Sequence, residues 1–296
     1  MENIRIGTCS WTDPTLIKSG TFYPADTTTA EARLAYYASQ FNVVEVDSSY
    51  YAMPDRQTAT LWAQRTPDGF LFDIKAFRLF TQHPTEAHAL PRDLRGALPK
   101  EIGKKQRFYY RDIPPEILRH LWARFEDVLL PLESAGKLGV VLFQFPEWFL
   151  PGVRQMDHIL TCKEQLKTHA LAVEFRNGLW LSDRNRDTTM SFLRDNGLAF
   201  VCVDGPQGFD SSIPPIAEVT ADIAVVRFHG RNATAWRAKR NKAVDRFNYY
   251  YSQEELEPWA KKIATCAEAA RQVHVLFNTN NGDQGVVNAR LMARLL

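Results

Sequence analysis

Pairs of charged side chains stand at the ends of several apolar runs of this sequence, and the two members of each pair are two positions apart. The pairs are Glu45 and Asp47, Asp73 and Lys75, Glu174 and Arg176, and Arg227 and His229. Residues two apart on a β-strand point to the same side of a sheet. Because charges removed from water must be paired or functional, the pattern predicts a polar site at the ends of buried strands. Structural ion pairing is the alternative.

Acid/base chemistry is the reaction type that these residues fit. The residues that we assign to catalysis are Glu45, Asp47, Lys75, Glu174 and His229. Glu174 or His229 would be the general acid or base, since an imidazole titrates near neutral pH. The other three would orient or polarise the substrate. Two alternatives stay open: His229 as a structural histidine, and Lys75 as a charge partner or a Schiff-base nucleophile.

A polar, anionic substrate, phosphorylated or sugar-like, suits the other polar residues near the ends of the runs. Arg176 and Arg227 would hold its anionic group. The full set that we assign to substrate binding is Trp11, Tyr50, Gln144, Arg176, Asp204, Arg227, Asn278 and Asn280. A hydrolase and an isomerase or lyase are the reaction classes that fit best, and the sequence does not choose between them.

Metal and cofactor binding receive little support from the sequence. A metal site needs two or more histidines or several carboxylates that focus on one point, and His229 is the one histidine at the end of an apolar run. We assign no metal ligands; a divalent metal bound by carboxylates stays open, and no cofactor motif is present. Cys9 could be a nucleophile, although a buried thiol is the simpler interpretation. The four cysteines are widely spaced without a CxxC motif, which indicates a reducing compartment.

Eight apolar runs must position these side chains, and helical segments separate most of them. The runs cover residues 4–9, 41–47, 70–75, 138–145, 171–176, 199–204, 223–229 and 273–278. Helical patterns cover residues 30–40, 56–66, 115–132, 156–169, 188–196, 252–272 and 288–296, whereas 12–29 is loop-like. The alternation predicts an α/β fold, a single (β/α)₈ TIM barrel. An open doubly wound sheet is the competitor, but no GxGxxG motif follows any run.

The barrel prediction brings the polar residues together, because the catalytic groups of such barrels lie at the C-terminal ends of the strands and in the loops that follow. We predict one domain over residues 1–296, with a long insertion, roughly 78–136, after the third strand.

The composition is that of an ordinary soluble globular protein, with 45% of the 296 residues apolar and 24% charged. A net charge of +2 gives no global attraction to nucleic acids or membranes. No apolar run is long enough for a membrane helix, and the first residues lack the apolar region of a signal peptide. We therefore expect a cytoplasmic monomer without membrane contact.

Two basic segments that carry aromatic residues follow strand ends. The first contains Arg92, Arg95, Lys100, Lys104, Lys105, Arg107 and Arg111. The second contains Arg231, Arg237, Lys239, Arg240, Lys242 and Arg246. Solvated loops are one interpretation. The other is a rim that attracts an anionic ligand, including nucleic acid, whose bases can stack on aromatic rings.

The same residues resemble the family known as domain of unknown function 72, the YecE-like proteins. The matching segments are Gly7-Thr8-Cys9-Ser10-Trp11, Glu45 with Asp47-Ser48-Ser49-Tyr50-Tyr51, residues 72–75, Gln144-Phe145-Pro146, Glu174-Phe175-Arg176, Arg227-Phe228-His229-Gly230-Arg231-Asn232, and Phe277-Asn278 with Gln284 and Asn288-Ala289. The resemblance covers nearly the whole chain and implies a TIM barrel with a polar pocket at the C-terminal strand ends, but no reaction. Thr279 departs from the family pattern, in which a second asparagine follows Phe-Asn.

Three hypotheses about function follow from the sequence. The family is similar in fold to xylose-isomerase-like and endonuclease IV-like barrels, but the metal-binding histidines of those barrels have no counterparts here. The first hypothesis is therefore an acid/base enzyme of unknown reaction that acts on a small polar anion. The second is a nucleic-acid-binding or repair-type nuclease barrel that uses the basic rim. The third is a non-catalytic ligand-binding barrel, since fold does not fix function.

Overall fold

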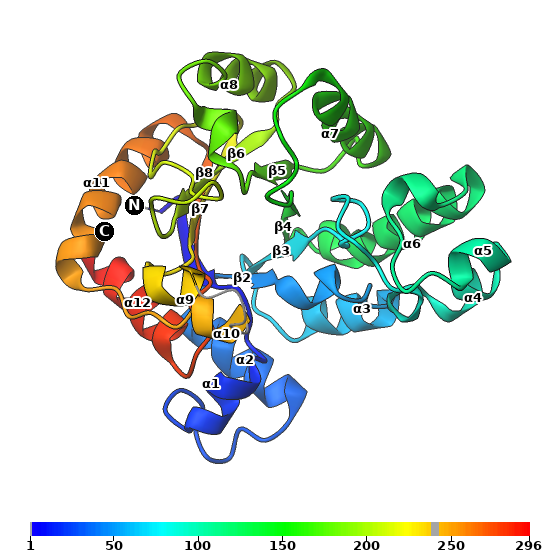
Figure 1. Ribbon diagram of the computed structural model, residues 1–296. Helices are drawn as coiled ribbons and strands as arrows, with labels where there is room; N and C mark the ends of the chain where they lie inside the picture. Colours follow the sequence, from blue (N-terminus) through cyan, green and yellow to red (C-terminus); the bar gives the residue numbers. More distant parts are fainter. Residues whose placement is uncertain (1, 238–242) are drawn as a thin grey trace.

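The computed structural model describes residues 2–237 and 243–296 and shows a closed barrel of parallel strands, in the order β1 to β8 (Figure 1). The strands of the barrel are β1 Ile4–Thr8, β2 Val43–Val46, β3 Leu71–Lys75, β4 Leu138–Gln144, β5 Leu171–Glu174, β6 Ala199–Asp204, β7 Ile223–Phe228 and β8 Gln272–Phe277. β1 pairs with β8 over five residues, which closes the cylinder. The predicted (β/α)₈ TIM barrel is confirmed.

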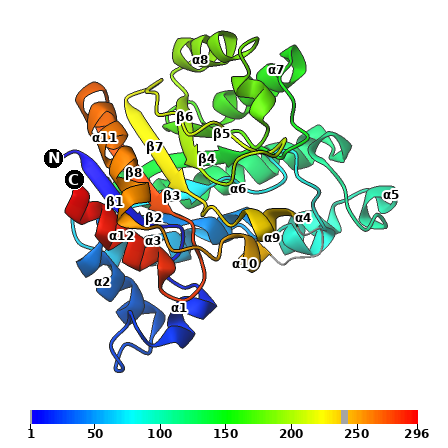
Figure 2. The ribbon, with the colours of Figure 1, turned by 60° about the vertical axis from the view of Figure 1, so that its left-hand side comes forward.

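Helices surround this barrel and cover its outer face (Figure 1). They are α1 Pro14–Ser19, α2 Ala30–Gln40, α3 Arg56–Gln64, α4 Arg92–Gly96, α5 Lys100–Gly103, α6 Pro115–Ser134, α7 Val153–Gln165, α8 Arg186–Asp195, α9 Ala233–Arg237, α10 Ala243–Arg246, α11 Gln253–Ala269 and α12 Gln284–Leu295, with short 3₁₀ turns η1 Asp47–Tyr50, η2 Ala87–Ala89, η3 Tyr110–Asp112 and η4 Gly178–Leu181. The connection from β6 to β7 contains no helix. Both chain ends lie at the end of the barrel opposite α9 and α10 (Figure 2). No helix among the described residues is both long enough and apolar enough to cross a membrane.

Several helical boundaries differ from the sequence prediction; α7, for example, covers Val153–Gln165 where 156–169 was predicted. The segment 12–29, predicted as a loop, contains α1, because the Asp13 carboxylate caps the backbone N–H groups of Thr15 and Leu16. The last helix begins at Gln284 and not at Asn288. α11 begins with a capping box: the Ser252 hydroxyl accepts from the Glu255 backbone, and the Glu255 carboxylate accepts from the Ser252 backbone.

The insertion between β3 and β4 is shorter than predicted. α6 packs against α3 and β4, so it belongs to the helical layer of the barrel. The additional part is therefore residues 76–114, which carry α4 and α5 at the outer edge beyond α6 (Figure 1). The predicted limits of 78–136 included α6, because its apolar periodicity gives no sign of which layer it joins.

Contacts between strands that are not neighbours show which side chains point into the barrel. Arg227 on β7 reaches Glu174 on β5 and Glu45 on β2. Asp73 on β3 reaches His274 on β8, with 2.9 Å between a carboxylate oxygen and Nδ1. Such pairs can only meet across the interior. The predicted phase of the charged residues on these strands is therefore correct.

Aromatic packing outside the barrel fixes this inward orientation on β5. Phe175, the residue between Glu174 and Arg176, points outward and stacks on Trp180 with 4.1 Å between ring centroids. Trp180 is fully buried, and its indole N–H donates to the Phe149 carbonyl at 2.6 Å. Burying a ring of this size stabilises the fold by roughly 2–3 kcal/mol. Since alternate residues of a strand face opposite sides, this packing directs Glu174 and Arg176 inward.

Candidate functional site

The carboxylate of Glu174 lies at the centre of the polar residues and is completely buried. Its Oε1 accepts hydrogen bonds from Gln144 Nε2 at 2.7 Å, His229 Nε2 at 3.0 Å and Arg176 Nη1 at 3.2 Å. Its Oε2 accepts from Nη1 of Arg227. Burial alone would raise the pKa of Glu174, but the charges of Arg227 and the bonded neighbours outweigh it and hold the pKa well below its usual range. Glu174 is therefore an ionised carboxylate with four donors.

A second buried carboxylate, Glu45, shares the guanidinium of Arg227. Arg227 Nη2 donates to Glu45 Oε1 at 2.6 Å and also lies 3.6 Å from the Cys9 sulfur. Glu45 Oε2 is buried and has no hydrogen-bond partner among the described residues. Burial raises the pKa of Glu45 to about 7, against the lowering effect of Arg227 and Lys75. Of the two glutamates on Arg227, Glu174 thus carries the negative charge and Glu45 holds a proton more readily.

The imidazole of His229 is held through both of its nitrogens. Nε2 donates to Glu174, and Nδ1 lies 3.0 Å from the side-chain nitrogen of Asn278. The Asn278 oxygen in turn accepts from Asn280 Nδ2 at 3.1 Å, which orients the amide with its nitrogen toward His229. Burial lowers the pKa of His229 to about 4 even though Glu174 favours the charged form. His229 is therefore neutral near pH 7, with its proton on Nε2.

Lys75 and Asp47 form an ion pair beside this cluster, with 2.7 Å between Nζ and Oδ1. Burial acts to lower the pKa of Lys75, but the charge of Asp47 outweighs it and raises the pKa. The ammonium group also lies 4.7 Å from the centre of the Tyr50 ring, within the range of a cation–π contact. Lys75 is thus a stable cation, which does not favour a Schiff-base role.

A cavity of about 650 Å³ opens above these groups. It is lined by Asp13, Asp47, Tyr50, Tyr51, Lys75, His83, Gln144, Pro146, Glu147, Trp148, Arg176, Trp236, Arg246, Phe247, Asn278 and Asn280. The Arg176 side chain is 14% exposed, and its guanidinium lies 5.2 Å from the centre of the Trp236 ring. Of the five N–H groups of Arg176, Glu174 occupies one. The others make no hydrogen bond with a described residue, and the side chain lines the cavity.

The structure brings most, but not all, of the predicted residues to this cavity. Asp47, Tyr50, Lys75, Gln144, Arg176, Asn278 and Asn280 line it directly. Glu45, Glu174, Arg227 and His229 do not line it and form its floor, beneath the residues to which they are bonded. We call these four residues the floor network.

Two residues that we expected to bind substrate lie elsewhere. The Asp204 carboxylate accepts from Trp259 Nε1 on α11 at 2.6 Å and from the hydroxyl of Tyr251, just before α11, at 2.7 Å. It also pairs with Arg231. Trp11 is 6% exposed and packs edge-on against Trp62, with 5.5 Å between ring centroids. Neither residue lines the cavity, so their positions correspond to structural roles.

His83 is the main site residue that the sequence reasoning missed. It lies in the loop after β3, where its Nδ1 is 2.9 Å from the Thr81 hydroxyl. Its Nε2 makes no hydrogen bond with a described residue, and the side chain lines the cavity. Burial, together with the charges of Lys75, Arg78 and Arg176, lowers the pKa of His83 to about 3. No strand period marks this histidine, since the fold of the loop alone brings it to the cavity.

Several side chains of the basic segments form ion pairs within the protein, which the sequence did not indicate. Lys105 pairs with Asp112 and Arg107 with Glu86, each at 3.3 Å. Arg231 is bound by Asp204. Lys239, Arg240 and Lys242 lie outside the described residues. Nucleic-acid binding by this rim stays a prediction.

Metal ligands were not assigned from the sequence, and the part of the chain that the structure describes contains no group of three or more His, Cys, Asp or Glu side chains placed to hold a metal ion.

The closed parallel barrel with a polar cavity at the C-terminal strand ends defines a (β/α)₈-barrel protein of the kind whose ligand sites lie in that position. The chain belongs to the family "Protein of unknown function DUF72", whose model matches residues 5–296. It is 32% identical over 297 residues to UPF0759 protein YunF of Bacillus subtilis (strain 168), covering 99% of this chain and 94% of the relative.

Two solved structures of DUF72 family proteins have the same fold. One, from Enterococcus faecalis V583, gives a TM-score of 0.79 at 24% identity, over 99% of this chain and 95% of the other. The other, from Thermotoga maritima MSB8, gives a TM-score of 0.75 at 25% identity, over 99% and 98% of the two chains.

Proposed function

We propose that this protein is an enzyme that binds a small, polar, anionic substrate in the central cavity and moves a proton on it. The observation that carries the proposal is Arg176. Its guanidinium is oriented by Glu174 on one side and by the Trp236 ring on another, while its remaining donors line the cavity. A planar fork held in this way matches a carboxylate or phosphate group. A phosphorylated or sugar-acid substrate has this chemistry.

The charges nearest Arg176 favour an anion. Three cations, Lys75, Arg176 and Arg227, lie close to two ionised carboxylates, Asp47 and Glu174. Burial keeps Glu45 largely protonated below pH 7. This inner group then carries a net charge of about +1, from three positive and two negative charges, in a partly enclosed cavity where charges interact more strongly than in water. The other charged residues of the cavity wall, Asp13, Glu147 and Arg246, together add about −1, so the positive charge is confined to the region around Arg176.

Proton transfer is best supported at His83. It is neutral, it lines the cavity, and its Nε2 is unoccupied by described residues. The cations that help to lower its pKa are the ones that an anionic substrate would neutralise, so substrate binding would raise the pKa of His83 toward the range of a general base. Lys75, held by Asp47, would polarise the substrate.

Glu174 and His229, which we expected from the sequence to exchange protons, fit a different role. Four donors surround the Glu174 carboxylate, and both nitrogens of His229 are bonded. We infer that they position Arg176, Gln144 and Asn278, the residues that face the substrate. Elimination or isomerisation and hydrolysis are the reactions that such a site supports.

Isothermal titration with inorganic phosphate tests the binding half of the proposal. Charge-assisted hydrogen bonds are worth about 1.5–3 kcal/mol, so Arg176→Gln is expected to weaken phosphate binding by roughly tenfold or more. Arg119→Gln is the matched control, because Arg119 is an exposed arginine on α6 outside the cavity. Equal affinity of the wild type and Arg176→Gln would overturn the assignment.

A screen of sugar phosphates and sugar acids for turnover tests the chemical half. We expect His83→Gln to abolish turnover of any substrate found, while phosphate still binds. Full turnover by His83→Gln would remove this residue from the mechanism.

A further inference from the structure

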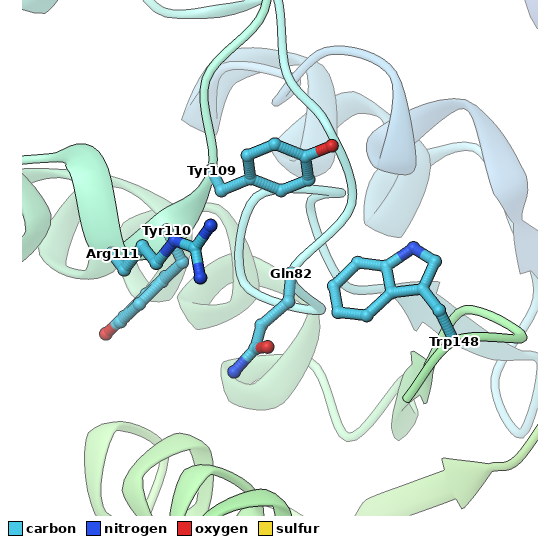
Figure 3. A pocket seen from close by; sticks show the side chains of 5 residues that line it. All are labelled: Gln82, Tyr109, Tyr110, Arg111 and Trp148. Carbon is cyan, nitrogen blue, oxygen red and sulfur yellow. The ribbon is translucent and has the colours of Figure 1, made fainter. Parts of the chain in front are cut away.

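A second cavity, of about 380 Å³, shares Trp148 with the first and has a different lining. It is lined by Gln82, Tyr109, Tyr110, Arg111 and Trp148 (Figure 3). The Tyr109 and Trp148 rings are 36% and 50% exposed, and they meet edge to face with 6.2 Å between centroids. The Arg111 guanidinium lies 5.8 Å from the centre of the Tyr109 ring. This cavity therefore offers a ligand aromatic surface with a cation at its margin.

The exposed rings stand on rigid supports. Phe108, next to Tyr109, is fully buried and exchanges two backbone hydrogen bonds of 2.8 and 2.9 Å with Thr85. Phe149, next to Trp148, is buried and stacks on Phe145 with 4.2 Å between centroids. Exposed aromatic side chains on a fixed backbone are pre-arranged for a ligand, because little conformational entropy is lost when they bind.

The two cavities meet at shared elements. Trp148 lines both of them. Consecutive residues of one loop divide between them as well, since Gln82 lines the second cavity and His83 the central one. One ligand can therefore occupy both, with its two parts on either side of Trp148.

The backbone of Gln82 is strained at this junction. Its φ of 61° makes it the one residue other than glycine with positive φ in the described part of the chain. Such a conformation costs about 1–3 kcal/mol and is found most often at functional sites. The Gln82 side chain makes no hydrogen bond with a described residue, so its amide can donate to and accept from a ligand.

We infer that the second cavity binds the planar ring of a ligand whose anionic group occupies the central cavity. A nucleoside monophosphate or an aryl phosphate has this chemistry. The ring would stack on Trp148 or Tyr109, the Gln82 amide would form hydrogen bonds with polar atoms at the ring edge, and Arg176 would bind the phosphate. The inference rests on the proposed function for the anionic half of the ligand and adds the ring half.

Calorimetric titration of the full chain with three kinds of probe tests this inference. The probes are inorganic phosphate, a panel of the common nucleoside 5′-monophosphates with 4-nitrophenyl phosphate, and an eight-residue oligothymidylate. Base–aromatic stacking is worth about 1–3 kcal/mol. We therefore expect at least one ring-bearing monophosphate to bind roughly tenfold more tightly than phosphate, and Tyr109→Ala and Trp148→Ala each to remove most of that advantage.

Tyr250→Ala is the matched control, because Tyr250 is 53% exposed and lines neither cavity. It should retain the advantage of the ring-bearing probe. The inference is overturned if no ring-bearing probe binds more tightly than phosphate, or if the advantage survives both substitutions. It is also overturned if the oligothymidylate binds more tightly than every monophosphate with a steep salt dependence, which would assign the cavity to a nucleic-acid strand.

The two proposals fail in different ways. If phosphate binds and depends on Arg176, but a ring adds nothing, the ring site is wrong and the anion site stands. If a ring-bearing probe depends on Tyr109 and Trp148 while Arg176→Gln changes no affinity, the anion site is wrong and the ring site stands.

Discussion

The side-chain nitrogen of Asn278 lies 3.0 Å from Nδ1 of His229, and this contact places the imidazole proton on Nε2, toward Glu174. An amide N–H is a donor only, so the nitrogen that faces it must be an acceptor. Burial, together with the charges of Arg176 and Arg227, lowers the pKa of His229 to about 4 even beside a carboxylate.

Replacing Asn278 by aspartate is expected to raise the pKa of His229 well above 4. A carboxylate in place of the amide favours a proton on Nδ1, and the protonated ring can then bond both the new carboxylate and Glu174. A ¹H–¹³C NMR titration of the imidazoles measures this pKa, with His229→Gln to assign the signal. Asn281→Asp is the control, since Asn281 makes no side-chain contact with His229; an unchanged pKa in Asn278→Asp would contradict the tautomer assignment.

Removal of the charge of Arg227 should destabilise the protein severely. Arg227→Met leaves Glu174 and Glu45 without their shared cation, and breaking a buried pair in this way costs about 3–5 kcal/mol. Urea denaturation followed by circular dichroism measures the free energy of unfolding. Arg56→Met provides the comparison, because its ion pair with Asp127 is exposed, and surface pairs contribute about 0–1 kcal/mol. A similar loss in both variants would mean that the floor network does not depend on Arg227.

Anion affinity should fall as the pH rises through 7. Glu45, whose pKa is about 7, is neutral below this pH and ionised above it. Ionisation lowers the net charge of the site by one. At about 10 Å between Glu45 and the bound anion, and an effective dielectric constant near 20, this weakens anion binding by roughly 1–2 kcal/mol. Sulfate is a suitable probe, since it does not titrate between about pH 5.5 and 8.5.

The matched variant for this experiment is Glu45→Gln, which has no charge at any pH. Its sulfate affinity should equal that of the wild type near pH 5.5 and stay constant up to about pH 8.5. Both proteins are compared in a His83→Gln background, because a bound anion is expected to raise the pKa of His83 from about 3 toward this range. His229, with a pKa of about 4, does not titrate in it. The same pH dependence in both proteins would show that another group is responsible.

Gly139→Ala should destabilise the lower part of the barrel interior. A Cβ at this position would lie 2.1 Å from an Asp73 carboxylate oxygen, which also accepts from the Val140 N–H at 2.9 Å and from His274. Overpacking of this kind costs about 1–3 kcal/mol. Gly96→Ala is the control, with no atom within 4 Å of the new Cβ. Equal thermal unfolding temperatures for the two variants would contradict the close approach at Gly139.

The sequence predicted the barrel through the alternation of apolar runs with helical segments, and much of the site through a period of two along the strands. Glu174 and Arg176 are in phase with each other, as are Arg227 and His229, so each pair had to share one face of its strand. β6 offered no such check: Asp204 has no polar partner two residues away, and it proved to belong to the outward parity, bonded to Trp259 on α11. A single polar residue at a strand end does not reveal which face it occupies.

The loop residues that reach the cavity could not be predicted from strand periodicity. His83, Trp148 and Trp236 reach the cavity from connections after β3, β4 and β7, and no periodicity records how a connection folds back. Trp11 shows the opposite case. It closely follows the first strand, yet the packing of its ring against Trp62 and Phe72 turns it away from the cavity.

The floor network crosses the mouth of the barrel and joins strands that are not neighbours. Glu45 comes from β2, Glu174 from β5 and Arg227 from β7, while Gln144 on β4 and Asn278 after β8 are bonded to the same group. Local opening of any one of these strand ends would break contacts on others, so their backbone amides should exchange with deuterium only on global unfolding, and the loops much earlier. The charged groups of the floor network are thus held in place by opposite sides of the barrel and do not depend on how the loops are arranged.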